Sequence, residues 1–82
     1  MKLYWPSAEY EDANGNLQRL STYDGCLDMA SARKVIADWK NYWKYDLRIA
    51  WVDVYERSVL LQTAHIGVNN GRILLTENYQ KE

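Results

Sequence analysis

The clearest hydrophobic pattern in the chain predicts one amphipathic helix over residues 28–44. Apolar side chains recur three and four positions apart, the spacing that gathers them on one helical face: Met29, Ala32, Ile36, Trp39 and Trp43. Asp28 is the expected N-cap, because its carboxylate can accept a hydrogen bond from a backbone amide of the first turn. Trp39, Trp43 and Trp51 are therefore the expected centre of the hydrophobic core.

Two strands are predicted before this helix. Residues 2–10 are rich in residues that favour strands, but Pro6 has no N–H to donate to a neighbouring strand. A strand that contains proline is expected at a sheet edge, or broken. The Asn14-Gly15 pair is typical of a hairpin turn, and residues 16–23 are expected to form the returning strand.

The clearest strand pattern covers residues 47–56. Alternation divides its apolar side chains between two faces: Leu47, Ile49, Trp51 and Tyr55 on one, and Ala50, Val52 and Val54 on the other. A strand that is apolar on both faces lies centrally in a sheet or is covered on both sides. Residues 59–66 and 72–76 are predicted to follow as strands, with a hairpin turn at residues 69–71.

This order of elements, β-β-α-β-β-β, predicts an α+β fold. Short links force the last strands to pair as antiparallel neighbours. The apolar stripe of the helix is wide enough to cover one face of a sheet. We therefore expect a mostly antiparallel sheet of four or five strands with one amphipathic helix packed on one face, in a single domain over residues 1–82.

The aromatic composition raises the question of what the rings contact. The chain has four Trp and seven Tyr but no Phe. Trp and Tyr carry a polar group and suit half-buried and interface positions. Large side chains also help a small domain to bury area, so this composition fits either a core role or a partner interface.

Charge excludes a strongly basic nucleic-acid-binding protein, because the net charge is −1. The charge is unevenly distributed, however, with an acidic excess in residues 1–30 and a basic excess in residues 31–50. Two candidate binding groups follow. The basic–aromatic group comprises Arg33, Lys40, Tyr42, Lys44, Tyr45 and Arg48, and the acidic group comprises Glu9, Glu11 and Asp12, with Asp24 and Asp28 nearby.

Each group has two interpretations. The basic–aromatic group could hold phosphates and stack on bases, or supply protein-binding hot spots. Its Lys and Arg stems could instead shield the edge of the apolar stripe. The acidic group could meet a basic protein groove, or it could simply keep the protein soluble.

The sequence contains no assembled catalytic or metal-binding motif. The chain has one cysteine, Cys26, and one histidine, His65, which cannot supply a four-ligand zinc site. Cys26 is expected as a small buried side chain, although its place before the helix could lower its pKa. Asp53 shares a strand face with apolar rings and is expected to reach solvent or a Tyr hydroxyl. We expect no enzyme activity, no cofactor and no metal.

The expected location of the protein follows from what the sequence lacks. A lone cysteine cannot form an internal disulfide, and residues 1–6 do not resemble a signal peptide. No apolar stretch approaches the length of a membrane span. We expect a cytoplasmic protein that does not enter the membrane and is a monomer or a homodimer.

A resemblance covers residues 20–56. The residues Ser21-Thr22-Tyr23-Asp24-Gly25-Cys26, Ala32, Trp39, Tyr42 and Ala50-Trp51-Val52-Asp53-Val54 resemble a pattern in short uncharacterised proteins of phages and mobile elements of Gram-positive gut bacteria. Such proteins often inhibit host machinery, and anti-CRISPR proteins are among them. The resemblance implies a small inhibitor or adaptor in a bacterial host cell that occludes the working surface of another protein, for example a nucleic-acid-processing effector. The alternative is a weak nucleic-acid-binding domain that uses the basic flank of the helix.

Overall fold

One sheet and one helix make up the described part of the chain. The computed structural model describes residues 1–69 and 72–81, with side chains for residues 1–67. The elements in chain order are β1 (Lys2–Glu11), β2 (Leu17–Ser21), α1 (Met29–Asn41), β3 (Leu47–Glu56), β4 (Val59–Asn69) and β5 (Arg72–Lys81). This confirms the α+β class and the β-β-α-β-β-β order. The predicted turn at residues 69–71 falls partly on residues 70–71, which lie outside the described residues.

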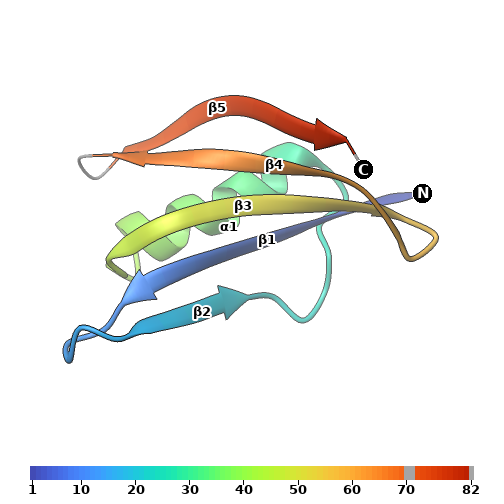
Figure 1. Ribbon diagram of the computed structural model, residues 1–82. Helices are drawn as coiled ribbons and strands as arrows, with labels where there is room; N and C mark the ends of the chain where they lie inside the picture. The colour runs from blue at the N-terminus through green and yellow to red at the C-terminus, as the bar shows by residue number, and fades with distance from the viewer. Residues whose placement is uncertain (70–71, 82) are drawn as a thin grey trace.

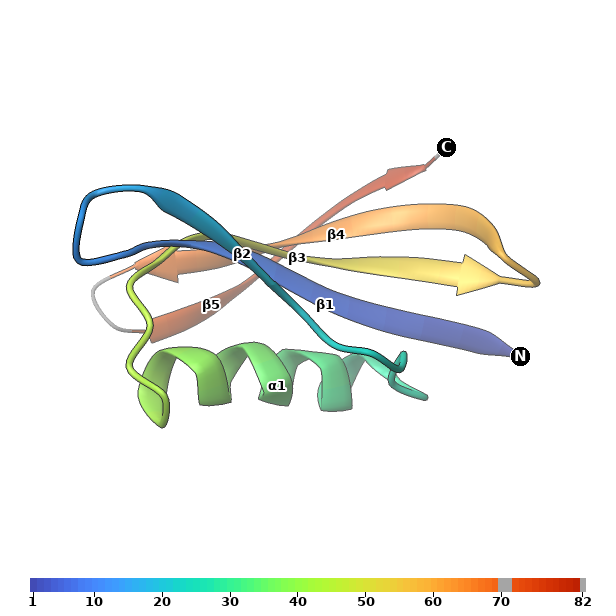
Figure 2. The same ribbon diagram turned by 90° about the horizontal axis from the view of Figure 1, so that it is seen from below.

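The strands form a five-stranded sheet in the order β2-β1-β3-β4-β5, and every neighbouring pair is antiparallel (Figure 1). Helix α1 lies across one face of this sheet (Figure 2). The connection that contains α1 carries the chain from the edge strand β2 past β1 to β3. None of the helices in the described residues has the length and apolar character needed to cross a bilayer.

The expected edge position of Pro6 is wrong, because β1 lies between β2 and β3. The backbone N–H and C=O of Tyr4 both bond to Cys26, on the β2 side of β1. Alternate residues of a strand direct their backbone groups to the same side, so Pro6 faces that side too. Strand β2 ends at Ser21, which lies opposite Ser7. Pro6 therefore sits where no ladder hydrogen bond is required.

Helix α1 begins as predicted and ends three residues early. The Asp28 carboxylate caps it, accepting a hydrogen bond of 2.7 Å from the Ser31 amide. Beyond Asn41, the amides of Tyr42 and Trp43 both donate to the Asp38 carbonyl, which closes the last turn.

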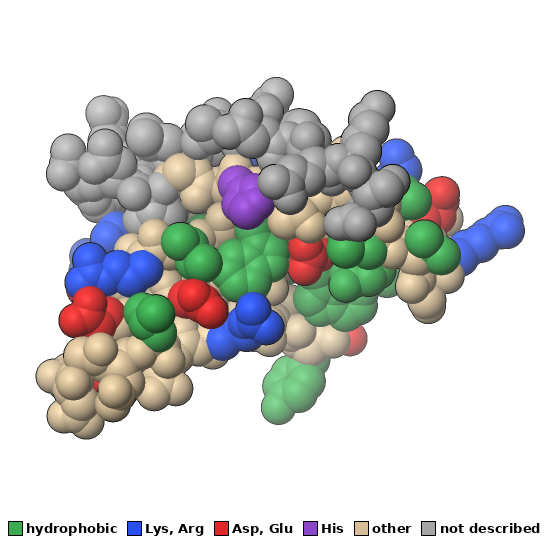
Figure 3. Space-filling model, viewed as in Figure 1, with side chains coloured by type: hydrophobic (Ala, Val, Ile, Leu, Met, Phe, Trp, Pro, Cys, Tyr) green, Lys and Arg blue, Asp and Glu red, His purple; other side chains and the backbone are tan. Residues whose placement is uncertain are grey.

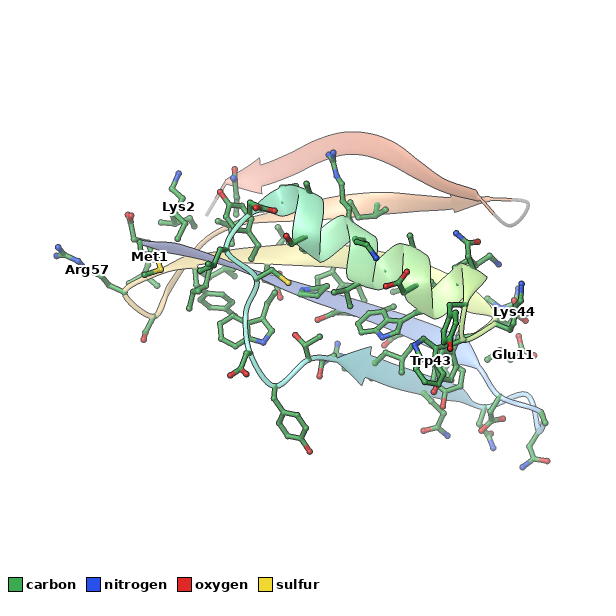
Figure 4. The ribbon with its side chains drawn as sticks, turned by 180° about the vertical axis from the view of Figure 1, so that it is seen from behind. Met1, Lys2, Glu11, Trp43, Lys44 and Arg57 are labelled. Atoms are coloured by element: carbon green, nitrogen blue, oxygen red, sulfur yellow. The ribbon has the colours of Figure 1, made fainter. Side chains whose placement is uncertain are left out.

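This early end moves Trp43 off the apolar stripe. Trp43 is 62% exposed and lies at the C-terminal end of α1 (Figure 4). Its expected place in the core is therefore wrong, whereas Trp39 is only 9% exposed and packs in the core as predicted. The expected position of Trp51 is also wrong, because it lies half-buried on the sheet face opposite the helix.

The core lies between α1 and one face of the central strands. Ala32 and Ile36 of the helix pack with Trp39 against buried residues of β1, β3 and β4: Ala8, Leu47, Ala50, Val52, Ala64 and Ile66. Small side chains on the sheet allow the helix to approach it closely. Leu47 reaches this face because the β1–β3 register shifts between Glu9 and Tyr10. The bulge makes Arg48 the extra residue, so the predicted grouping of Leu47 with Ile49 is wrong.

Candidate binding surface

The sheet face opposite α1 carries apolar and polar side chains and is covered by no other described element. We call it the open face. Residues directly opposite one another on paired strands share a face. The register therefore places on the open face Leu3, Trp5, Ser7 and Glu9 of β1, Ile49, Trp51, Asp53 and Tyr55 of β3, and Arg19, Thr63 and His65 of the neighbouring strands. Figure 3 views the molecule from this side and shows hydrophobic side chains along the middle of the sheet.

Trp51 and Ile49 form the apolar middle of the open face. Ile49 is 51% exposed, and Trp51 is half-buried. The Arg19 guanidinium lies over the Trp51 ring, 5.1 Å from its centroid. His65 pairs with Trp51 across the β3–β4 ladder and is exposed. The middle of the face is thus apolar, and polar groups from the neighbouring strands surround it.

One row of the open face places a carboxylate among aromatic rings. Trp5, Asp53 and Thr63 lie opposite one another on β1, β3 and β4. The Thr63 hydroxyl donates a hydrogen bond of 2.8 Å to Asp53 Oδ1. Trp51 and Tyr55 are the residues two positions before and after Asp53 on the same strand face. The sequence predicted that Asp53 would share a face with these rings and reach solvent or a Tyr hydroxyl, but the hydroxyl that it binds belongs to Thr63.

An open groove of about 440 Å³ lies beside this row. Leu3, Trp5, Ser7, Asp53, Tyr55 and Arg57 are among the residues that line it. The rings of Trp5 and Tyr55 meet edge to face, with centroids 5.9 Å apart and planes at 85°. The Trp5 indole N–H donates to the Thr22 carbonyl at 3.2 Å, which fixes the ring at the groove. Sequence reasoning missed Trp5, because only the β1–β3 pairing brings it to Asp53.

The structure separates the members of the basic–aromatic group. Lys40 lies in the last turn of α1, and Lys44 follows the helix in the left-handed conformation, with φ of 63°. Tyr42 is 74% exposed and meets Trp43 edge to face, with ring centroids 5.1 Å apart. Arg33 is half-buried on the helix. Lys40, Tyr42 and Lys44 thus lie at the helix C-terminus. Trp43, for which the apolar spacing predicts a core position, adds an exposed ring there.

Tyr45 and Arg48 are engaged by other parts of the protein. The centroid of the Tyr45 ring lies 4.6 Å from the centroid of the Tyr10 ring, and Tyr45 packs against the core. Arg48 forms ion pairs with Glu11 and, at 3.1 Å, with Asp46. Glu11 comes from the acidic group, so the structure joins two predicted surfaces that the sequence treated as separate.

The rest of the acidic group serves local structure or lies apart. Asp12 shapes the β1–β2 turn, because its side chain accepts hydrogen bonds from the amides of Asn14 and Asn16 and from the Gln18 side chain. These bonds, the one from Asn16 foremost, lower the pKa of Asp12 below its usual value. Glu9 lies on the open face opposite Arg19, Asp28 caps the helix, and Asp24 is exposed in the connection between β2 and α1.

Cys26, His65 and Asp53 do not meet in one site. Cys26 packs against the core on the helix side of the sheet, whereas His65 and Asp53 lie on the open face. Burial raises the pKa of the Cys26 thiol, and the nearby Asp28 carboxylate raises it further. A position before the helix N-terminus could have lowered this pKa, but the structure gives the opposite direction.

These positions leave two exposed surfaces with groups suited to binding: the open face with its groove, and the corner at Tyr42, Trp43 and Lys44. Within the described residues, no cluster of three or more His, Cys, Asp or Glu side chains could hold a metal ion. Comparisons with protein-family models, curated proteins and solved structures found no match to this chain.

Proposed function

We propose that the protein is a non-enzymatic module that binds another protein through its open face and occludes the working surface of that partner. The observation that supports this proposal most directly is the apolar middle of the open face, where Ile49 is half exposed and Trp51 lies under the Arg19 guanidinium. Trp, Tyr and Arg are the residue types enriched at protein-binding hot spots.

The arrangement around these residues also resembles an interface. Protein interfaces place apolar and aromatic groups at the centre and polar groups at the rim. On the open face, Ile49 and Trp51 hold the central position, while Glu9, Arg19 and His65 lie on their flanks. Strands fix these side chains before binding, which limits the entropy lost on association. A rigid face of this kind suits stoichiometric inhibition by occlusion.

Affinity capture followed by mass spectrometry, with matched variants, tests the proposal. The wild type is expected to capture a partner at a fixed ratio, and Ile49→Lys and Trp51→Ser are expected to lose it. Leu27→Ser is the control, because Leu27 is an exposed apolar residue of the loop before α1. Circular dichroism verifies that each variant is folded. The proposal would be contradicted if both open-face variants still captured the partner. It would also be contradicted if the isolated protein were fully active without a stable partner.

The corner at the end of α1 supports a second candidate function, weak binding of single-stranded nucleic acid. Tyr42 and Trp43 expose two rings on which bases could stack, and Lys40 and Lys44 lie beside them. We rank this function second, because Glu11 and Asp46 neutralise the nearby Arg48.

Salt dependence separates the two functions. Nucleic-acid binding would fall steeply with salt and would disappear in Lys40→Glu with Lys44→Glu, while Ile49→Lys would leave it unchanged. Lys34→Glu is the control for charge alone, since Lys34 lies on α1 and pairs with Asp38 at 3.5 Å. Binding that is insensitive to the Lys40 and Lys44 changes would reject this second function.

A further inference from the structure

We infer that the groove lined by Trp5, Asp53 and Tyr55 receives a lysine or arginine side chain from a partner protein, with the Asp53 carboxylate as its counter-ion. This inference rests on the proposed function, because it assigns a chemistry to one part of the open face. The carboxylate, the rings around it and the direction of the neighbouring arginine carry the inference.

The first observation is that Asp53 has capacity for another donor. It is half-buried on the open face, and among the described residues Thr63 is its only hydrogen-bond donor. A carboxylate offers about four lone-pair sites on its two oxygens, and a partly buried charge is costly unless it is paired. A cationic group in the groove would supply the missing pair.

The second observation is the aromatic surroundings of this carboxylate. Trp5 lies directly across from Asp53, and Trp51 and Tyr55 flank it along β3. Ring faces attract ammonium and guanidinium groups, and the attraction grows when the cation is desolvated. The same face already holds one cation in this way, since Arg19 lies over Trp51. Rings and carboxylate together favour a cation over an anionic or purely apolar side chain.

The third observation is that the protein's own groove-lining arginine extends away from Asp53. Arg57 lies in the β3–β4 turn at the outer end of the groove, and its side chain points out from the sheet (Figure 4). The groove volume of about 440 Å³ falls within the usual range of binding sites, roughly 300–1,000 Å³. It can therefore take a basic side chain together with adjoining backbone.

Titration of the labelled protein with blocked tripeptides tests this inference by amide and indole N–H NMR. The probes are Ala-Lys-Ala and Ala-Arg-Ala, with Ala-norleucine-Ala as the neutral control and Ala-Glu-Ala as the acidic one. The basic peptides are expected to shift the Trp5 indole signal and the amides of Asp53 and Tyr55 saturably. The two control peptides are expected to bind at least about tenfold more weakly.

Variants locate the site. Asp53→Asn is expected to weaken binding of the basic peptides about tenfold, whereas Asp24→Asn, an exposed carboxylate elsewhere, leaves it unchanged. Tyr55→Phe is expected to retain binding and Tyr55→Leu to weaken it, which separates the ring from the hydroxyl. Should Asp53→Asn fail to fold, the lysine-to-norleucine comparison on the wild type decides the question.

Two results would overturn the inference without touching the proposed function. One is equal binding of the norleucine and lysine peptides, which would make the groove merely apolar. The other is partner capture that survives Asp53→Asn but is lost in Ile49→Lys, which would place the partner on the face and outside the groove. Loss of the proposed function itself would show as no captured partner with the wild type.

Discussion

The indole ring of Trp5 lies directly against Gly25, so close that a Cβ atom at that position would clash with the ring. A Cβ added to Gly25 would lie 2.9 Å from Trp5 Cε3 and Cζ3 and 3.0 Å from Leu3 Cβ. The glycine is needed here for close approach, because the loop before α1 runs beside β1 and pairs with it through Cys26.

Gly25→Ala is therefore expected to destabilise the protein by about 1–3 kcal/mol, the usual cost of forcing an extra group into a packed site. Urea unfolding followed by tryptophan fluorescence measures the change. In a Trp5→Leu background the same substitution should cost less, since the ring that it meets is gone. Equal costs in both backgrounds would show that the contact with Trp5 is not the cause.

Trp39 and Trp43 are expected to differ sharply when replaced by alanine. Trp39→Ala should lower the free energy of unfolding by about 3–5 kcal/mol, because it leaves a cavity between α1 and the sheet. Trp43→Ala should change it by less than about 0.5 kcal/mol, because the side chain is mostly exposed. Chemical denaturation of the two variants side by side checks this, and a similar loss in both would contradict the early end of α1.

The N-cap of α1 should make part of the protein's stability depend on acid. Hydrogen bonds from the Ser31 amide, and then from its side chain, lower the pKa of Asp28 below the usual 3.8. A lowered folded pKa means that this stabilisation is present above the unfolded value and is lost as pH falls through the folded one. Asn retains a capping oxygen but cannot titrate.

The melting temperature of Asp28→Asn should consequently fall less steeply below about pH 4 than that of the wild type. Thermal melts at several pH values measure the slope. Asp24→Asn is the control, because it removes an exposed carboxylate outside the cap. If the melting temperatures of the wild type and Asp28→Asn fell in parallel with pH, Asp28 would not contribute to the loss of stability in acid.

The Cys26 thiol should react slowly. Burial and the Asp28 carboxylate raise its pKa above the usual 9.0, so less thiolate is present at neutral pH than in the unfolded chain. Iodoacetamide alkylation of the folded protein at pH 7 is expected to be slower than alkylation in denaturant, and Asp28→Asn should speed it. Faster reaction in the folded state would show that the helix N-terminus governs the thiol after all.

The β3–β4 turn should be easy to stabilise. Arg57 and Ser58 both adopt the left-handed region, with φ of 52° and 67°, a conformation that hairpins usually assign to Asn-Gly. Arg57→Asn with Ser58→Gly is expected to raise the free energy of unfolding by about 1 kcal/mol. Destabilisation by the double change would contradict the turn geometry.

Local periodicity predicted those parts of the fold that depend on neighbouring residues. The stripe through Ala32, Ile36 and Trp39 set the buried face of α1, and alternation over residues 47–56 gave the bounds of β3. The same periodicity misled at Trp43, because a helical spacing continues through residues whose amides close the final turn. It also assigned Leu47 to the wrong face of the sheet, because a bulge reverses the alternation and no sequence pattern indicates the bulge.

The candidate site was predictable only in part, for a related reason. Alternation along β3 placed Asp53 beside Trp51 and Tyr55, so these three residues of the open face could be recognised in advance. Trp5 could not, because its position depends on the register between β1 and β3, two strands far apart in the chain. Pro6 pointed to an edge strand, whereas the neighbouring β2 simply ends before reaching it.

The position of β1 between β2 and β3 also dictates an order of assembly. The β1–β2 hairpin closes over a short turn, but the pairing of Lys2 with Glu56 brings together residues from distant parts of the chain. Long loops of this kind close slowly. During synthesis the β3 side of β1 must therefore wait unpaired until residues 47–56 leave the ribosome, and during that interval it is an edge open to association with other chains.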